Sequence, residues 1–338
     1  MRKARLLAEH TGYYHVILKA TGPQYLFRED ANKRAFQDIL ERSARFSGVG
    51  VLAFALLDNH FHLLVRVPER ESVPSADSPE FRDRVEALYG RDRAERLFDR
   101  WVRWTEKGRI AEVALERDRF LRRMHDLGQF VKTLKEWHSR VYRETHGWEG
   151  TLWRGRYKSI IVAGAFDELR RIALYIALNP VRAEIVKKGT DSPWTSYGQS
   201  KTAGTFGWRC HAELLRELAR LAGPTEGTDS RNGGTDSATG EGADSLAAAF
   251  DVWMAEADAV SREKVLGKIE RGESLSPAEM LVCRIHAFSN GLALGSRESL
   301  ESVPLPEKRI TPIAPGDRLC TATRLRGTMF RVFLRVSA

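Results

Sequence analysis

The sequence has few cysteines, and their spacing suits neither a disulfide nor a zinc site. The three of them, Cys210, Cys283 and Cys320, lie far apart, and the chain contains no CxxC pair. This spacing argues against a disulfide framework or a cysteine-ligated zinc site, and it favours a reducing cytosol.

Long apolar runs are also lacking. The first residues, MRKARLLAEHTGYYHV, carry charge but no apolar core of the length that signal peptides have. No apolar stretch approaches the roughly 18 residues of a membrane span. We therefore expect a cytoplasmic, nucleoid-associated protein with no membrane partner.

Positive charge, by contrast, is in excess. The 338 residues include 54 Lys and Arg against 45 Asp and Glu, which gives a formal net charge of +9. An acidic partner is favoured, and nucleic acid is the commonest one, with eight Trp and eight Tyr available for stacking on bases. A basic globular protein with no such partner explains the charge equally well.

The apolar pattern predicts an α+β domain over residues 1–222. Strands are expected at 13–19, 49–57 and 60–67, the last two joined as a hairpin by Asp58-Asn59, and a fourth near 157–163. Helices are expected at 31–47 and 165–179, and the second must end near Pro180 because proline disfavours helical dihedrals in the preceding residue.

Three further segments have distinct compositions. Residues 71–128 predict a charged helical insertion, and residues 117–145 are compatible with one long helix. Residues 223–244 contain almost no large apolar side chain and predict a flexible linker. Residues 245–338 predict a small, mostly helical domain. Within it, Gly295 and a Ser296 N-cap fit either a helix-turn-helix that contacts duplex DNA or a small helical packing unit.

The sequence His60-Phe61-His62 is the sharpest local feature. Side chains alternate between the faces of a strand, so His60 and His62 point the same way while Phe61 points into a core. Two neutral imidazoles placed in this way can chelate one metal ion. Two partly exposed strand histidines with no ligand are the alternative.

The helix that ends in LYIALNPVRA is the second feature. At 100° per residue, Phe166, Leu169, Ile172, Ala173 and Ile176 form its core face. The opposite, polar stripe contains Glu168, Arg171, Tyr175, Asn179 and, if the helix continues that far, Arg182. Tyr175 is therefore expected to face solvent, either as a functional group or as an ordinary half-exposed tyrosine.

A phenol with a pKa of about 10 is a poor nucleophile at neutral pH, and a divalent metal can offset the charge that develops when it attacks a phosphate. A two-histidine metal site and Tyr175 therefore form a sensible pair. Asn179, on the tyrosine's face, is a candidate third ligand through oxygen. A mixed nitrogen and oxygen ligand set suits Mg or Mn.

Five blocks in order carry a resemblance to a known family: YHVILK, VLAFALLDNHFHLLVRVP, GTLWRGRYKSIIV, LYIALNPVRAEIV and SPWTSY. Over residues 10–200 the chain resembles the HUH single-tyrosine transposases, in particular the REP-associated tyrosine transposases and their insertion-sequence relatives. The resemblance implies a ferredoxin-like antiparallel sheet backed by helices. It places the family's two metal-binding histidines at His60 and His62, its nucleophile at Tyr175 and its polar metal ligand at Asn179.

The resemblance also implies a transposase or single-strand endonuclease activity. Tyr175 would attack a phosphate in single-stranded DNA, form a 5′-phosphotyrosine and release a 3′-hydroxyl that can later rejoin the DNA. The expected substrates are hairpin-containing repeats or element ends, and a homodimer is compatible with this role. Residues 71–128 are longer and more charged than the family core requires, which leaves the contacts to DNA ends open.

Basic residues surround the proposed nucleophile in the sequence. Arg154, Arg156 and Lys158 precede the helix of Tyr175, and Arg171 and Arg182 flank Tyr175 itself; all five are candidate DNA contacts. Trp153 and Tyr157 can stack on bases, although a core anchor is the favoured explanation for Trp153.

Two other functions are compatible with parts of this pattern. A non-catalytic or domesticated DNA-binding protein of the same fold is the serious alternative. An HxH pair also opens the metal site of barrel hydrolases, but such a barrel needs repeated strand–helix units and further ligands, which the sequence does not predict.

Overall fold

The computed structural model describes residues 8, 10–21, 26–223, 238–282, 293–295, 308–312 and 330–334. Four antiparallel strands form one side of its sheet, in the order β2-β3-β1-β4, with β2 at the edge. Their bounds are β1 Gly12–Lys19, β2 Gly50–Leu57, β3 His60–Val67 and β4 Lys158–Val162. The three N-terminal strands lie within one residue of their predicted bounds.

Two helices cover one face of this sheet. Helix α1 (Asp30–Ser47) connects β1 to β2, and α5 (Leu127–His146) precedes β4. Both pack on the apolar side chains of alternate strand positions, among them Val16, Phe61 and Leu63. The β-α-β-β-α-β order with strands arranged 4-1-3-2 is the ferredoxin-like fold, which confirms the predicted fold class.

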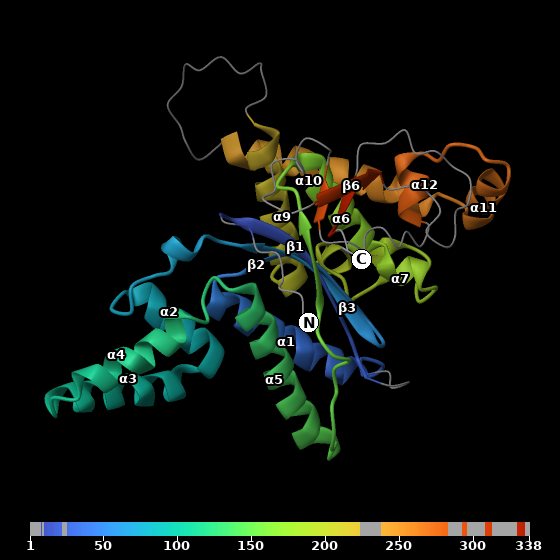
Figure 1. Ribbon diagram of the computed structural model, residues 1–338. Helices are drawn as coiled ribbons and strands as arrows, with labels where there is room; N and C mark the ends of the chain where they lie inside the picture. The colour runs from blue at the N-terminus through green and yellow to red at the C-terminus, as the bar shows by residue number, and fades with distance from the viewer. Residues whose placement is uncertain are drawn as a thin grey trace, which may run out of the picture.

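The opposite face is covered by later helices, so the sheet lies between two helical layers (Figure 1). These helices are α6 (Phe166–Ala177), α9 (Phe206–Ala222) and α10 (Ala238–Asp258). Short elements connect or follow them: α7 Asn179–Arg182, η2 Gly189–Asp191, α8 Ser196–Gln199, α11 Arg262–Glu270 and α12 Pro277–Val282.

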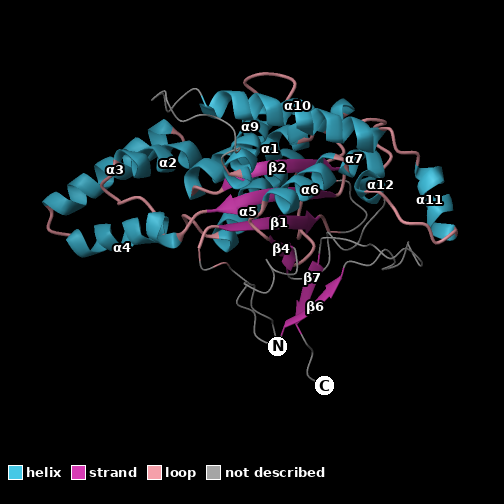
Figure 2. Ribbon diagram, turned by 90° about the horizontal axis from the view of Figure 1, so that it is seen from above, coloured by secondary structure: helices cyan, strands magenta, loops and turns pink. Residues whose placement is uncertain are grey.

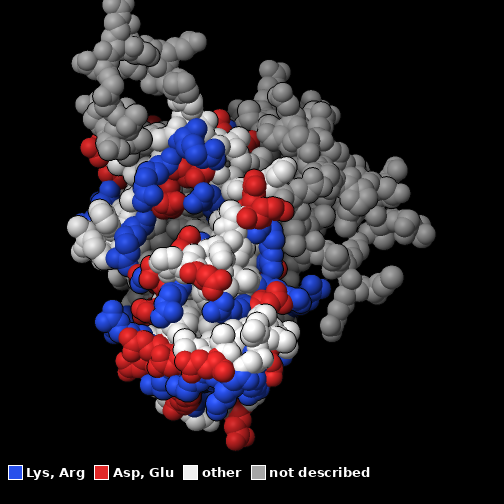
Figure 3. All heavy atoms as spheres, turned by 90° about the vertical axis from the view of Figure 1, so that its left-hand side faces the viewer, with Lys and Arg blue, Asp and Glu red and all other residues white. Residues whose placement is uncertain are grey.

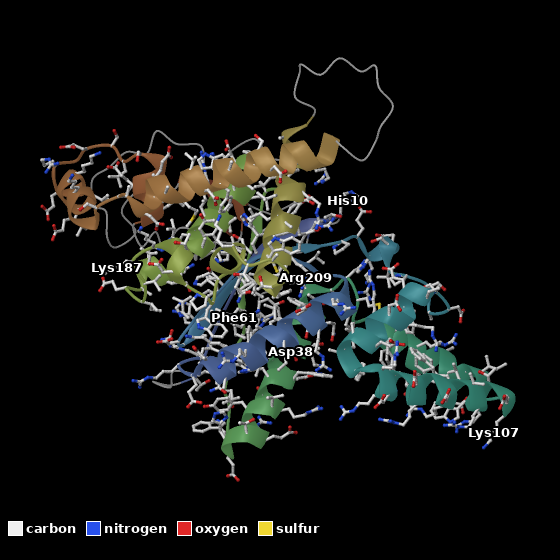
Figure 4. The ribbon with its side chains drawn as sticks, turned by 180° about the vertical axis from the view of Figure 1, so that it is seen from behind. His10, Asp38, Phe61, Lys107, Lys187 and Arg209 are labelled. Atoms are coloured by element: carbon white, nitrogen blue, oxygen red, sulfur yellow. The ribbon has the colours of Figure 1, made fainter. Side chains whose placement is uncertain are left out.

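The predicted insertion forms an arm that projects from the domain (Figure 1). After the single turn η1 (Arg70–Ser72) come α2 (Pro79–Tyr89), α3 (Arg91–Glu106) and α4 (Ile110–Leu121), with a separate apolar core around Phe81 and Trp101. Lys107, in the turn between α3 and α4, lies at the far end of this arm, well away from Phe61 in the sheet core (Figure 4).

The expected single helix over residues 117–145 is wrong. Helix α4 ends at Leu121, His125 adopts a positive φ of 47°, and its backbone N–H donates to the Ser47 carbonyl at 2.7 Å. The Asp126 carboxylate then accepts from the Gln129 N–H and caps the start of α5. A contact with a distant residue therefore interrupts a helical pattern that continues in the sequence.

The C-terminal part differs from the expected separate, mostly helical unit. Three strands, β5 Ala293–Gly295, β7 Phe330–Leu334 and β6 Lys308–Pro312, extend the same sheet beyond β4 (Figure 2). Phe250 and Met254 of α10 and Leu294 of β5 are buried in the core that contains α6 and α9. The boundary at residue 222 thus divides residues that share one core.

Two C-terminal expectations fall largely outside the described residues. Of the predicted linker, residues 224–237 lie outside them, and residues 238–244 belong to α10. Of the predicted helix-turn-helix, Ser296 and the residues that follow lie outside them, whereas Gly295 ends strand β5. None of the helices in the described ranges combines the length and hydropathy that a membrane crossing requires.

Candidate functional site

The HxH histidines lie on the face of the sheet that α6 covers. Ile17 of β1 pairs with His62 of β3 and with Lys158 of β4, so these side chains share one row across the sheet. His60 is opposite Lys19 in the next row. The alternation predicted from the sequence is therefore present: His60 and His62 share a face, and Phe61 is buried on the other.

His62 is bonded to a third histidine that the sequence pattern did not single out. The Nδ1 atom of His62 lies 2.9 Å from Nε2 of His15, and the two rings are stacked with centroids 5.1 Å apart. Both side chains are buried. The one available signal was a polar residue at the centre of the apolar strand YYHVILK, but the pairing of β1 with β3 was needed to place it beside His62.

Electrostatics keep His62 in its neutral form. Burial is the main cause that lowers the pKa of His62 well below the ordinary histidine value, and the neighbouring His15, His60, Arg182 and Lys19 lower it further. A neutral imidazole has one nitrogen with a free lone pair, which is the form that binds metal ions.

His60 is half-buried at the start of β3, and its ring centroid lies 5.1 Å from that of His62. Its Nδ1 lies 2.6 Å from Oδ1 of Asn59. If Nδ1 carries the proton and donates to Asn59, Nε2 is the nitrogen of His60 with the lone pair that a metal ion would bind.

Tyr175 is brought to the same place by helix α6. Its ring centroid lies 6.0 Å from that of His62 and 5.8 Å from that of His15, both in edge-on geometry. The structure therefore unites three residues, His15, His62 and Tyr175, that come from two strands and a helix far apart in the sequence.

The expectation that Tyr175 faces solvent is wrong. Only 6% of its surface is exposed, and Glu168, Asn179 and Arg182 of the same predicted polar stripe are also buried. The reason is tertiary: the Tyr175 ring lies against His15 and His62 of the sheet, and Arg182, which is bonded to the Leu281 carbonyl of α12, lies over the ring. Angular position on a helix gives the residues that share a face, but not what packs on that face.

Asn179 and Arg182 are both held by the end of α6. The amide Nδ2 of Asn179 donates to the Tyr175 carbonyl at 3.2 Å, which leaves its Oδ1 as an acceptor. Arg182 donates from one nitrogen to that same carbonyl at 2.5 Å and from the other to the Leu281 carbonyl of α12 at 2.8 Å. Its guanidinium is thus engaged inside the protein, which differs from the expected phosphate contact.

The other four predicted DNA contacts are more accessible. Arg154, Arg156 and Lys158 are exposed in the segment that leads into β4, and Arg171 is half-buried on α6. Lys158 shares the sheet row of His62, at a distance of roughly 10 Å given two strand spacings. Lys158 therefore lies on the same face of the sheet as the histidines.

The aromatic residues near this segment have packing roles. Trp153 is buried and donates from Nε1 to the Lys135 carbonyl at 3.3 Å, as expected of a core anchor. Tyr157 is buried in the core on the α1 and α5 face, away from the face of Tyr175. Tyr142 stacks on His146 of its own helix, with ring centroids 4.2 Å apart.

Three side chains near Tyr175 carry atoms that could bind a divalent metal. His60 and His62 supply nitrogens and Asn179 an amide oxygen, an acceptable mixed set. Among the described residues, however, no three side chains of His, Cys, Asp or Glu form a group that could hold a metal ion. The site thus offers two imidazoles and one neutral oxygen, with no carboxylate among them.

Comparison with known proteins does not assign the chain to a family. No protein-family model matches the chain, and no curated protein matches it. A solved structure titled "Structure of the REP associates tyrosine transposase bound to a REP hairpin" is similar over 61% of this chain and 88% of its own, with 14% sequence identity and a TM-score of 0.38. A likeness this remote carries no conclusion about function.

Proposed function

We propose that this chain is a transposase-like enzyme that cuts and rejoins single-stranded DNA through Tyr175. The observation that carries the proposal is the placement of the Tyr175 ring 6.0 Å from His62, beside an HxH pair on the same face of a ferredoxin-like sheet. Five ordered sequence blocks that resemble the single-tyrosine transposases support it, as does the net charge of +9.

In the proposed reaction, the Tyr175 oxygen forms a bond to the scissile phosphorus and gives up its proton to solvent. The bond from phosphorus to the 3′ oxygen breaks, and that oxygen leaves as a hydroxyl after taking a proton. The product is a 5′-phosphotyrosine that conserves the energy of the bond, so the 3′-hydroxyl of the same or another strand can reverse the step without ATP.

His60, His62 and Asn179 would hold a divalent ion, Mg or Mn, which supplies charge stabilisation to the phosphate when bound. The hydrogen bond between His62 and His15 would fix the orientation of the His62 ring. Exposed Arg154, Arg156 and Lys158, with Arg171, would contact the DNA backbone. The expected DNA contains hairpins, as repeats or element ends do.

The proposed reaction requires the buried Tyr175 side chain to become accessible to DNA. With 6% of its surface accessible, Tyr175 reaches a phosphate only after some of the covering structure moves. The same burial, together with the absence of a carboxylate ligand among the site residues, favours the alternative of a DNA-binding protein that does not cut. The barrel hydrolase is excluded, because the strands form an open ferredoxin-like sheet.

The test is the change Tyr175→Phe, which removes one oxygen and keeps the ring. Labelled single-stranded DNA from the flanks of the gene is incubated with wild type and variant, with Mg or Mn and with a chelator. The wild type should form a covalent adduct that survives denaturing gels, mapped to Tyr175, and the variant should form none. An adduct at Tyr142 or Tyr157, or undiminished cutting by the variant, would overturn the assignment. DNA binding without any cutting would support the non-catalytic alternative.

A further inference from the structure

A groove of about 730 Å³ lies between helix α5 and the segment that follows it, outside the site described above. Its α5 wall carries Lys135, Arg140 and Arg143, and its opposite wall is formed by residues 151–153 and Gly155. Leu152 and Trp153 of this second wall are buried. Its volume is within the range of about 300–1,000 Å³ that is usual for ligand sites.

Two of these basic side chains connect the second wall to α5 through hydrogen bonds. Lys135 donates to the Gly155 carbonyl at 3.0 Å, and Arg143 donates to the Gly150 carbonyl at 3.4 Å. Gly150 and Gly155 have φ angles of 115° and 62°, which residues with side chains rarely adopt. The wall thus has a defined shape, and two cations are oriented along its edge.

Positive charge at the groove is incompletely neutralised. Arg140 lines the groove and is exposed, and so are Arg154 and Arg156, which flank the lining residue Gly155 in the chain. The side chains of these three arginines have no ion pair or hydrogen bond to another of the described residues. Two carboxylates, Glu136 and Glu144, also line the groove, but Glu136 pairs with Lys132.

The arm carries cations of both kinds. Arg109, Arg117 and Arg122 are paired with acidic neighbours, whereas Arg93 and Arg96 are exposed on α3. The view that faces the arm shows basic and acidic side chains interleaved (Figure 3).

The groove leads toward the site of Tyr175. After α5 the chain returns alongside that helix to the sheet (Figure 1). Trp153 forms a β-bridge with Ala20, just past the end of β1, and Lys158 then begins β4 in the row of His62. Arg154 and Arg156 lie between these two points in the chain, so basic side chains continue from the groove to the sheet face.

We propose that this groove binds the phosphate backbone of single-stranded DNA, with Arg140 and Arg143 of α5 as contacts, and that the strand continues past Arg154 and Arg156 toward Tyr175. The inference rests on the proposed function for the identity of its ligand. A single strand is favoured over a duplex because the proposed reaction at Tyr175 takes single-stranded DNA, and a positively charged groove can follow the phosphates of one strand.

The experiment measures binding alone, so that its failure is distinguishable from a failure of the Tyr175 assignment. The full chain carrying Tyr175→Phe is titrated with a fluorescent single-stranded oligonucleotide and with the matching duplex, over a range of salt concentrations. Two double variants are made in this Tyr175→Phe protein. The first combines Arg140→Ala with Arg143→Ala in the groove. The second, a matched control, combines Arg93→Ala with Arg96→Ala and removes two exposed cations from the arm.

The groove pair should weaken single-strand binding at least tenfold and reduce the salt slope by about 1.4, because each phosphate contact on a single strand contributes about 0.7. The control pair should change affinity by less than threefold. Replacing Arg140 and Arg143 by Lys should retain most of the affinity, and thermal melting confirms that each variant is folded. Equal losses in the groove and arm pairs, no loss in the groove pair, or a loss confined to the duplex would overturn the proposal.

Discussion

The guanidinium of Arg182 lies over the ring of Tyr175, 3.9 Å from the ring centroid, and also donates to the Tyr175 carbonyl. Its other nitrogen donates to the Leu281 carbonyl of α12. One buried side chain thus links the proposed nucleophile to the C-terminal segment. In this arrangement Arg182 is a positioning residue, and a direct phosphate contact would require it to leave both carbonyls.

Arg182→Ala should therefore lower stability while leaving DNA affinity nearly unchanged. The buried Leu281 carbonyl loses the Arg182 donor, which costs about 1–3 kcal/mol, while the Tyr175 carbonyl keeps the hydrogen bond from Asn179. The free energy of unfolding in urea and the affinity for a single-stranded oligonucleotide are measured together, with exposed Lys187→Ala as the control. A large loss of affinity with an unchanged unfolding free energy would instead identify Arg182 as a phosphate contact.

The two HxH histidines should respond differently to substitution. His60 is half-buried, so His60→Ala should change stability by about 0.5 kcal/mol or less. His62 is buried and hydrogen-bonded to His15, so His62→Ala should lower the free energy of unfolding by about 1–3 kcal/mol.

Metal binding is measured on the purified protein by calorimetric titration with Mn²⁺. The wild type should bind the ion and His60→Ala should bind it much more weakly while remaining folded. Equal Mn²⁺ affinity in the two proteins would remove His60 from the ligand set.

A chain that ends at residue 222 should be less stable than the full chain. It loses Phe250, Met254 and Leu294 from a core shared with α6 and α9, and each large buried apolar side chain contributes about 1.5–3 kcal/mol. Thermal melting compares the two lengths. Within the full chain, Phe250→Ala should lower Tm, and Val252→Ala, on an exposed position of the same helix, should not. An unchanged Tm after truncation would support the domain boundary that the sequence composition predicted at residue 222.

His138 should make stability depend on pH. Burial lowers the pKa of His138 to about 3, and its Nδ1 has no hydrogen-bond partner among the described residues. In the unfolded chain this histidine takes up a proton near pH 6.5, and in the folded chain only near pH 3. Protonation therefore favours the unfolded chain between these values: the free energy of unfolding is highest above pH 6.5 and falls as the pH is lowered toward 3. At pH 5 the loss is about 2 kcal/mol.

The change His138→Phe removes the titrating group and keeps an aromatic ring. Urea unfolding at pH 7 and pH 5 should show a smaller difference for the variant than for the wild type. A variant with the same difference between the two pH values as wild type would assign the acid sensitivity to other groups, such as buried His211, whose pKa is lowered to about 4.

Features that depend on local sequence pattern could be predicted, and features that depend on tertiary contacts could not. The bounds of β1, α1 and the β2–β3 hairpin followed from apolar periodicity, because one face of each element must be buried whatever covers it. The break between α4 and α5 did not follow, because His125 is held by the carbonyl of Ser47, a residue of another helix.

For the candidate site, the sequence alone determined that His60 and His62 share a face, since the period of a strand fixes this relation within one element. Tyr175 belongs to α6, whereas Asn179 and Arg182 belong to α7, so their position relative to Tyr175 depends on how the chain continues after Ala177. Only the tertiary structure placed His15 against His62, because strand register depends on pairing between segments. It also decided that Tyr175 is buried. That outcome depends on contacts of its ring with His15, His62 and Arg182, which no property of the α6 sequence specifies.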